Sequence, residues 1–229
     1  MPSTLALIAA LALPLSLARA DLLLVQEVET EGSRTEMTMR IKGSKVRVDA
    51  TPMATSIIDT TTGDMVNLIH PQKMVMRMSG AQLADMAKAF KPATPEKPVA
   101  QPDLKPSGKK ETIAGYPAEE YVTEVEGTKM SLWLTKAVPE WEKIVAELGA
   151  MSRGAWAKQF QGPAQVDYDP AKLPGLPVKT EMTPPTGGKV VILFKSMDRK
   201  ALPDADFAIP EGYKEMQMPA MGMPATAEP

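Results

Sequence analysis

The first half of the chain alternates apolar and polar residues along short runs that are separated by turn residues. "LLLVQEVE", "SRTEMTMRIKG" and "KVRVDA" are followed by "ATSIIDTTTGDMVNLIHPQKMVMRM", which holds three more runs of this kind. Strict alternation is typical of antiparallel strands with one face towards solvent. Turns at Gly43, Gly63 and Pro71 divide the runs. The pattern from Asp21 to Met78 therefore predicts a series of antiparallel strands.

Two later stretches change to helical spacing. In "MSGAQLADMAKAF" the apolar residues at this spacing are Leu83, Met86, Ala87 and Phe90. Ser79 and Gln82 form a capping box in front of them, and Met78 is placed to pack on Leu83 as a hydrophobic staple. In "PEWEKIVAELGAM" a second apolar stripe consists of Trp141, Ile144, Val145 and Leu148. Two amphipathic helices are therefore predicted.

The remaining segments predict further strands and one long loop. Residues 91–108 carry five prolines with no periodicity, which predicts an exposed loop inside one domain, with a boundary between two domains as the alternative. "TIAGYPAEEYVTEVEGTKMSLWLTK" and the pair "LPVKTEMT" and "KVVILFKSM" each predict a hairpin. Gly115, Tyr116 and Pro117 are interpreted as a bend through which the sheet curls.

These elements together predict an α+β fold. The expected form is a strongly curved, mostly antiparallel half-barrel of about nine or ten strands, with the two helices packed on its concave face. Residues 21–213 would form this single domain, and residues 214–229, rich in Met and Pro, a disordered tail. Residues 1–20 resemble a cleaved signal peptide, because an apolar run ends at the small-residue tripeptide Ala18-Arg19-Ala20. A membrane anchor is the alternative, but the run is shorter than the ~20 residues that a spanning helix needs.

Composition narrows the class of protein. The chain has 229 residues, no cysteine, and 26 Lys and Arg against 28 Asp and Glu. The absence of cysteine excludes disulfides and a lipid-carrying cysteine, so a periplasmic or secreted protein without a transmembrane segment in the mature chain is expected. The near balance of charge argues against a nucleic-acid partner, which requires a basic surface. We expect a monomer.

Several short motifs resemble those of a known family. They are G-x-K-x-R-x-D at Gly43–Asp49, I-x-D-x-x-x-G at Ile57–Gly63, G-Y-P-A-x-x-Y at Gly115–Tyr121, W-x-T at Trp133–Thr135 and F-x-I-P-E-G-Y at Phe207–Tyr213. The chain resembles the secreted bacterial domain-of-unknown-function family 4412. That family is similar in layout to the LolA/LolB-type lipoprotein-carrier half-barrels. The resemblance implies a fold, and its motifs are turns without reactive groups.

Residues capable of catalysis are few, and we expect no enzyme. His70 is the only histidine, which excludes a His-pair metal site, and its place before Pro71 predicts a solvated turn residue. A triad with Ser56 or Ser79 lacks the G-x-S-x-G context. The carboxylates of the kind that a glycosidase uses are interpreted as a solvated strand face; they are Glu119, Glu120, Glu124, Glu126, Asp204 and Asp206.

Methionine is unusually frequent, at 17 residues. Methionines on the strand faces could line a groove for a lipid, a lipoprotein or an apolar peptide, because the thioether side chain adapts to varied shapes. An ordinary filled core is the alternative. The candidate groove residues are Met37, Met39, Met74, Met76, Met78, Leu83, Met86, Phe90, Leu132 and Trp141. The predicted function is a non-enzymatic protein that binds a hydrophobic ligand or an envelope protein, with a role in envelope maintenance.

A second group of methionines lies near the C-terminus, at Met216, Met218, Met221 and Met223. Thioethers at this density are soft ligands that suit Cu(I). The sequence therefore leaves three hypotheses open. They are a hydrophobic-ligand binder without a cofactor, a copper-handling protein, and a purely structural or interaction domain with a filled core.

Overall fold

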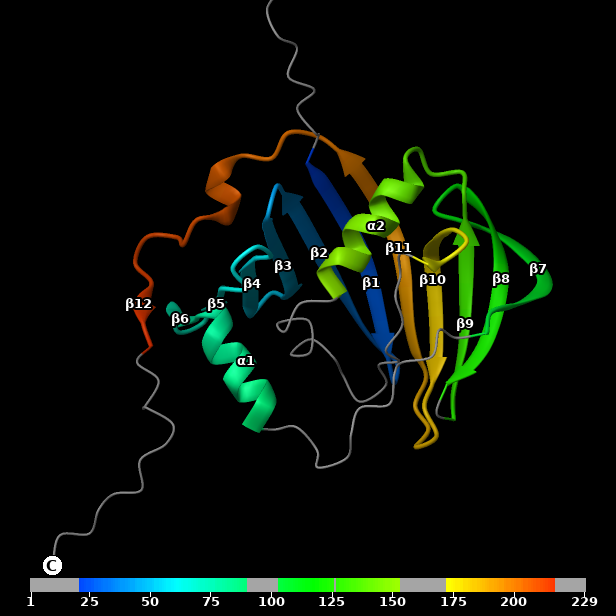
Figure 1. Ribbon diagram of the computed structural model, residues 1–229, viewed down its shortest axis with the longest axis horizontal. Helices are drawn as coiled ribbons and strands as arrows, with labels where there is room; N and C mark the ends of the chain where they lie inside the picture. The colour runs from blue at the N-terminus through cyan, green and yellow to red at the C-terminus, as the bar shows by residue number, and fades with distance from the viewer. Residues whose placement is uncertain (1–20, 90–102, 126, 153–171, 217–229) are drawn as a thin grey trace, which may run out of the picture.

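The computed structural model describes residues 21–89, 103–125, 127–152 and 172–216. Within these ranges 12 strands form one sheet with two free edges, in the order β12-β6-β5-β4-β3-β2-β1-β11-β10-β9-β8-β7. Two α-helices lie on one side of this sheet (Figure 1). The α+β class and the mostly antiparallel sheet are confirmed, whereas the expected signal peptide at residues 1–20 falls outside the described residues.

The first six strands follow one another in sequence and in space. They are β1 (Leu22–Thr30), β2 (Ser33–Lys42), β3 (Lys45–Thr51), β4 (Ala54–Asp59), β5 (Met65–Ile69) and β6 (Met74–Met78). Each pairs antiparallel with the next. The strands predicted from alternation between Asp21 and Met78 are therefore confirmed. Short turns suffice here because antiparallel neighbours need no crossover.

The second half of the chain forms the other wing of the sheet. Its strands are β7 (Lys105–Ile113), β8 (Tyr116–Val125), β9 (Thr128–Thr135), β10 (Leu176–Thr183) and β11 (Val190–Arg199). β11 pairs with β1 and so joins the two wings at the centre. β12 (Lys214–Glu215) pairs parallel with β6 and forms the opposite edge.

The strand number was underestimated, because β7 and β12 were not predicted. β7 is exposed at every residue except Ile113, and a register shift interrupts its pairing between Pro106 and Lys110. An exposed edge strand has no buried face, so it carries no apolar alternation. As a result, residues 105–108, which were expected to belong to the proline-rich loop, form the start of a strand. Likewise, the first two residues of the expected tail, Lys214 and Glu215, form β12, which pairs with β6.

The Gly-Tyr-Pro element was also misinterpreted. Ala114 and Gly115 connect β7 to β8 with φ angles of 50° and 83°. A two-residue hairpin turn of this kind requires positive φ, which glycine adopts without strain. Tyr116 and Pro117 already belong to β8 and pair with Ile113 and Thr112. The element is therefore a hairpin turn at the sheet edge and not a bend within the sheet.

The first helix, α1 (Gly80–Ala89), begins as the sequence predicts. The backbone N–H of Ser79 donates to Gln82 Oε1 over 2.9 Å, and the Gln82 N–H donates to Ser79 Oγ over 3.2 Å. These reciprocal bonds satisfy donors that a helix start leaves unpaired, so the capping box is confirmed. In Figure 1, α1 lies beside β5 and β6, and α2 (Trp141–Ser152) lies in front of β1 and β11.

The buried apolar residues form three clusters. The main core lies between the sheet and the helices and contains Leu22, Leu24, Val46, Ile58, Met78, Leu83, Ile144 and Val145, among others. A second cluster joins Ile57, Leu68 and Val75 to Leu202 and Phe207 of the segment that follows β11. A third consists of Met130, Leu132, Leu134 and Leu173. None of the helices in the described ranges is long and apolar enough to cross a membrane.

Candidate functional site

Four half-buried methionines, on strands β2 and β6 and on helix α1, pack against the main core. We call Met37, Met39, Met76 and Met86 the methionine face. Met39 lies directly between Leu24 of β1 and Val48 of β3, and both of these neighbours are buried in the main core. Met76 belongs to β6 and Met86 to α1. These side chains therefore meet the core on one side and remain partly open on the other.

The remaining predicted groove residues divide into three groups. Met78 and Leu83 are buried in the main core, and half-buried Trp141 packs against it with the Lys136 ammonium 5.8 Å from its ring centroid. Leu132 lies in the third cluster, and half-buried Met74 is at the sheet edge beside β12. Phe90 falls outside the described residues. The structure thus brings most of the predicted residues to the main core and separates Leu132 from it.

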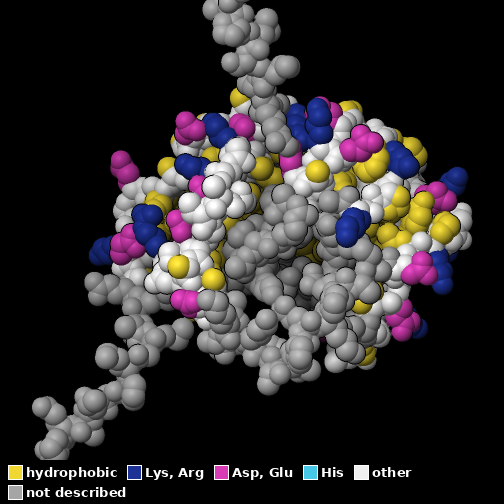
Figure 2. All heavy atoms as spheres, viewed as in Figure 1, with side chains coloured by type: hydrophobic (Ala, Val, Ile, Leu, Met, Phe, Trp, Pro, Cys, Tyr) yellow, Lys and Arg dark blue, Asp and Glu magenta, His cyan; other side chains and the backbone are white. Residues whose placement is uncertain are grey.

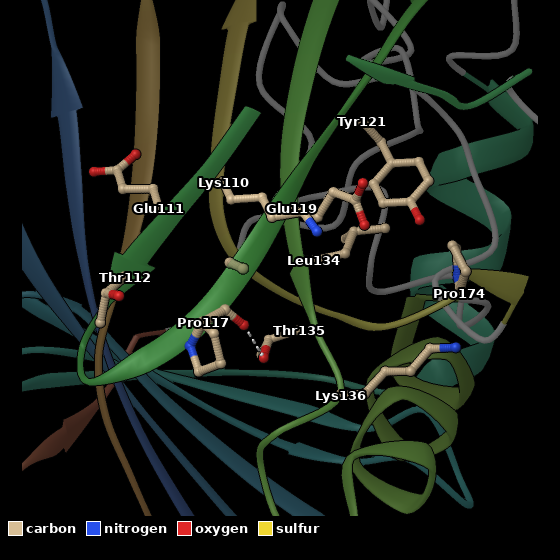
Figure 3. Close-up of a pocket in the computed structure, with 11 residues that line it drawn as sticks. Lys110, Glu111, Thr112, Pro117, Glu119, Tyr121, Leu134, Thr135, Lys136 and Pro174 are labelled. Carbon is tan, nitrogen blue, oxygen red and sulfur yellow. Dashed lines mark hydrogen bonds between the residues drawn. The ribbon is translucent and has the colours of Figure 1, made fainter. Parts of the chain in front are cut away.

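A cavity of about 500 Å³ opens on strands β7 to β9 (Figure 3). Its floor is a row of directly paired residues, Lys110, Glu119 and Leu134, and in Figure 3 the Tyr121 ring lies beside Glu119. Figure 2 shows apolar side chains gathered over this wing of the sheet. The cavity could not be predicted from the sequence pattern, because one of its walls is the unpredicted strand β7. Polar and apolar groups line it together, without a nucleophile beside a base.

Glu120 is not the solvated side chain that strand alternation predicted. It is only 3% exposed, on the strand face opposite Glu119. Ser107 Oγ donates to Glu120 Oε2 over 2.6 Å, and Lys109 Nζ lies 3.2 Å from the same oxygen. The Ser107 hydrogen bond is the largest cause that lowers the pKa of Glu120 below its ordinary value. Both partners come from β7, so the burial of Glu120 could not be predicted without that strand.

Replacing Ser107 with alanine should raise the pKa of Glu120 towards its ordinary value of 4.5. The carboxylate would lose its shortest donor and keep the exposed Lys109 ammonium and the Ser131 hydroxyl. A lowered pKa contributes stability above pH 4.5 that is lost as pH falls through the folded value, so the variant should lose this contribution. A ¹³C NMR titration of the Glu carboxyl groups measures the shift. An unchanged Glu120 titration would contradict the assignment, with exposed Glu124 as the internal reference.

His70 is part of a hydrogen-bonded network and is not a free turn residue. Its Nε2 lies 2.8 Å from Thr55 Oγ1, and its Nδ1 lies 2.5 Å from the Tyr213 hydroxyl. Thr55 donates its own proton to Asp49 Oδ1 over 2.5 Å, so the His70 Nε2–H must donate to Thr55. The network ties the C-terminal segment to the sheet.

Neither serine that was considered for a triad bonds to His70. Ser56 Oγ donates to Asn67 Oδ1 over 2.6 Å, and Ser79 forms the helix cap. The arrangement therefore lacks the bond between nucleophile and base that acyl transfer requires. Across the described segments, no three His, Cys, Asp or Glu residues gather as metal ligands.

Asp49 is the centre of a group of ion pairs that connects the Gly43–Asp49 motif to the C-terminal segment. Arg40 and Arg47 both form ion pairs with it, and Arg47 Nη1 also donates to the Asp206 carbonyl over 2.7 Å. Desolvation raises the pKa of Asp49, but the Thr55 hydrogen bond and the Arg47 charge outweigh this, so the pKa is lowered. The motif around Arg47 and Asp49 therefore holds the C-terminal segment in place.

Comparison with known proteins gives a family and distant structural likenesses. The family model described as "Domain of unknown function (DUF4412)" matches residues 22–213. No curated protein matches the chain. Among solved structures, MucB is 14% identical with a TM-score of 0.39. The match covers 85% of the present chain and 58% of the MucB chain. The MucA/MucB complex of Pseudomonas aeruginosa contains a chain that is 13% identical with a TM-score of 0.40. The match covers 91% of the present chain and 62% of that chain.

A LolA superfamily protein from Nitrosomonas europaea is 10% identical with a TM-score of 0.31. The match covers 84% of the present chain and 91% of the Nitrosomonas chain. The chain spans only 31% to 62% of the length of the first structures that it resembles.

Proposed function

Because the chain belongs to the DUF4412 family, whose description names no activity, we propose a function from the geometry of the sheet and its helices. The protein binds an apolar ligand, such as a lipid, a lipoprotein or an apolar peptide, at the methionine face. It acts as a binding protein and not as an enzyme. The observation that carries this proposal is the half-buried state of Met37, Met39, Met76 and Met86 against the buried main core.

The chemistry of methionine supports this role. An unbranched thioether side chain changes shape at low cost, so a surface lined with it accepts ligands of different outline. Each CH₂ group of a bound chain that leaves water contributes about 0.8 kcal/mol. Rigid β-branched residues such as Val46 and Val48 stay buried next to this surface and hold its floor in place.

The proposed setting follows from the N-terminal sequence. Residues 1–20 serve as a cleaved signal, and the mature chain works in the periplasm or outside the cell. Curvature of the sheet around α1 and α2 completes a half-barrel whose interior holds the ligand. A monomer with this interior takes up single apolar molecules or a segment of an envelope protein, and so contributes to envelope maintenance.

Replacing Met39 with tryptophan should reduce uptake of a fluorescent fatty acid at least tenfold. The larger ring fills the space between the sheet and the helices, and overpacking there costs about 1–3 kcal/mol. Fluorescence titration of the mature protein with the probe measures the affinity, and native mass spectrometry of protein from envelope extracts identifies copurified ligands.

Met182→Trp is the matched control, because Met182 is also half-buried but packs against the third cluster. Thermal unfolding of both variants shows whether either has lost its fold. Equal affinity of Met39→Trp and the unaltered protein would contradict the proposed site. Failure of the unaltered protein to take up any probe would contradict the proposed function.

A further inference from the structure

Met216, the first of the C-terminal methionines, meets the strand methionines at one edge of the sheet, whereas Met218, Met221 and Met223 lie outside the described residues. β12 runs parallel to β6, with Lys214 beside Met74 and Glu215 beside Val75. The Met216 N–H donates to the Val75 carbonyl over 2.8 Å and continues this pairing by one residue. Met216 therefore lies next to Met76. Sequence spacing alone did not reveal this, because about 140 residues separate the two strands.

The contacts of neighbouring residues show which face Met216 occupies. Tyr213 bonds to His70, and Glu215 forms an ion pair with Arg77 over 2.7 Å. Arg77 alternates with Met76 and Met78 along β6, and Met78 is buried in the main core on the helix side. Since successive strand residues point to opposite faces, Met216 shares the helix side with Met74 and Met76.

We propose that Met74, Met76 and Met216 form a binding site for Cu(I). Neighbouring strands lie about 4.8 Å apart, so three long thioether side chains on one face can reach a common ion. Thioether sulfur is a soft ligand that selects Cu(I) over the hard divalent ions that carboxylates prefer. Glu215, the acidic residue between Lys214 and Met216, points to the other face, where it forms an ion pair with Arg77. Lys214, which pairs with Met74 and so lies on this face, has its side chain exposed to solvent.

This site is separate from the methionine face in its chemistry, although Met76 belongs to both. Leucine has nearly the volume and apolar character of methionine but no sulfur. The double variant Met74→Leu and Met216→Leu, which keeps Met76 and the rest of the methionine face, should therefore weaken metal binding and leave apolar-ligand uptake intact. Failure of the copper site and failure of the proposed ligand site are thus distinguished by one variant.

The test is a Cu(I) titration of the full mature protein against a chromogenic chelator, without oxygen. The triple variant Met74→Leu, Met76→Leu and Met216→Leu should bind at least tenfold more weakly than the unaltered protein. The control triple variant Met130→Leu, Met182→Leu and Met197→Leu removes three thioethers elsewhere in the described fold and should bind as the unaltered protein does. Equal weakening by both triple variants would overturn the proposal.

A second measurement locates the ion directly. In protein with ¹³C-labelled methionine methyl groups, Ag(I), a stable substitute for Cu(I), should shift the signals of Met74, Met76 and Met216 together. Fatty-acid uptake by the double variant Met74→Leu and Met216→Leu, which keeps all four residues of the methionine face, should stay within twofold of the unaltered protein. Shifts confined to Met218, Met221 and Met223 would overturn the proposal, as would an unaltered protein that binds no Cu(I).

Discussion

Replacement of Asp49 by alanine should lower the free energy of unfolding by about 2–3 kcal/mol at pH 7. The variant leaves Arg40 and Arg47 without their shared carboxylate, and Thr55, which is 1% exposed, without its acceptor. An unpaired buried hydroxyl alone costs about 1–3 kcal/mol. The side chain of Asp49 keeps 24% exposure, which places the total below that of a fully buried ion pair. Urea unfolding measures the change.

The same substitution has a defined pH dependence. The folded-state pKa of Asp49 lies below its ordinary value of 3.8, so its contribution to stability is complete above that pH. As pH falls through the lowered pKa, the unaltered protein loses this contribution, whereas the Ala variant has none to lose. The difference in unfolding free energy between the two proteins should therefore shrink below pH 3.8.

Glu29→Ala is the matched control for Asp49. Glu29 also pairs with an arginine, with 3.0 Å between Glu29 Oε2 and Arg34 Nε, but these side chains are 36% and 65% exposed. Exposed ion pairs contribute about 0–1 kcal/mol, so the control should unfold close to the unaltered protein. Equal losses for the two variants would show that Asp49 acts as an ordinary surface charge.

Local patterns predicted most of the fold. Alternation identified β1 to β6, and the Ser79–Gln82 capping box located the start of α1, because each signal is contained within a few neighbouring residues. The two edge strands, β7 and β12, could not be predicted from local patterns, and the reason is physical. β7 buries no face, and β12 owes its existence to pairing with β6, far away in the chain.

The candidate sites likewise combine features that local patterns predict with features that depend on distant segments. That Met37 and Met39 share a face follows from their spacing, and the structure places both against the main core. The burial of Glu120 and the hydrogen bonds of His70 depend on Ser107 and Tyr213, which other segments supply. The meeting of Met216 with Met76 likewise requires the parallel pairing of β12. Properties that arise from long-range pairing have no local sequence signal.

Gly80→Ala should destabilise the protein by about 3 kcal/mol or displace α1, although helix propensity predicts the opposite. Alanine is favoured over glycine in a helix by about 1 kcal/mol. A Cβ atom at Gly80, however, would lie 2.2 Å from the Thr62 carbonyl oxygen and 3.2 Å from the Gly63 backbone. Both neighbours are main-chain atoms that no rotamer change can move away. The steric cost therefore exceeds the gain in propensity, since overpacking costs about 1–3 kcal/mol even where side chains can yield.

The displaced helix also links this prediction to function. The Gly80 N–H donates to Asp64 Oδ1 over 2.9 Å, and α1 carries Leu83 into the core and Met86 to the methionine face. Uptake of the fluorescent fatty acid should therefore fall together with stability. Gly43→Ala is the control, because its Cβ meets no atom within 4 Å and its φ of 57° costs only about 1–2 kcal/mol. A Gly80→Ala protein as stable as the unaltered chain, with full uptake, would show that α1 need not contact the turn at Gly63 to form the binding face.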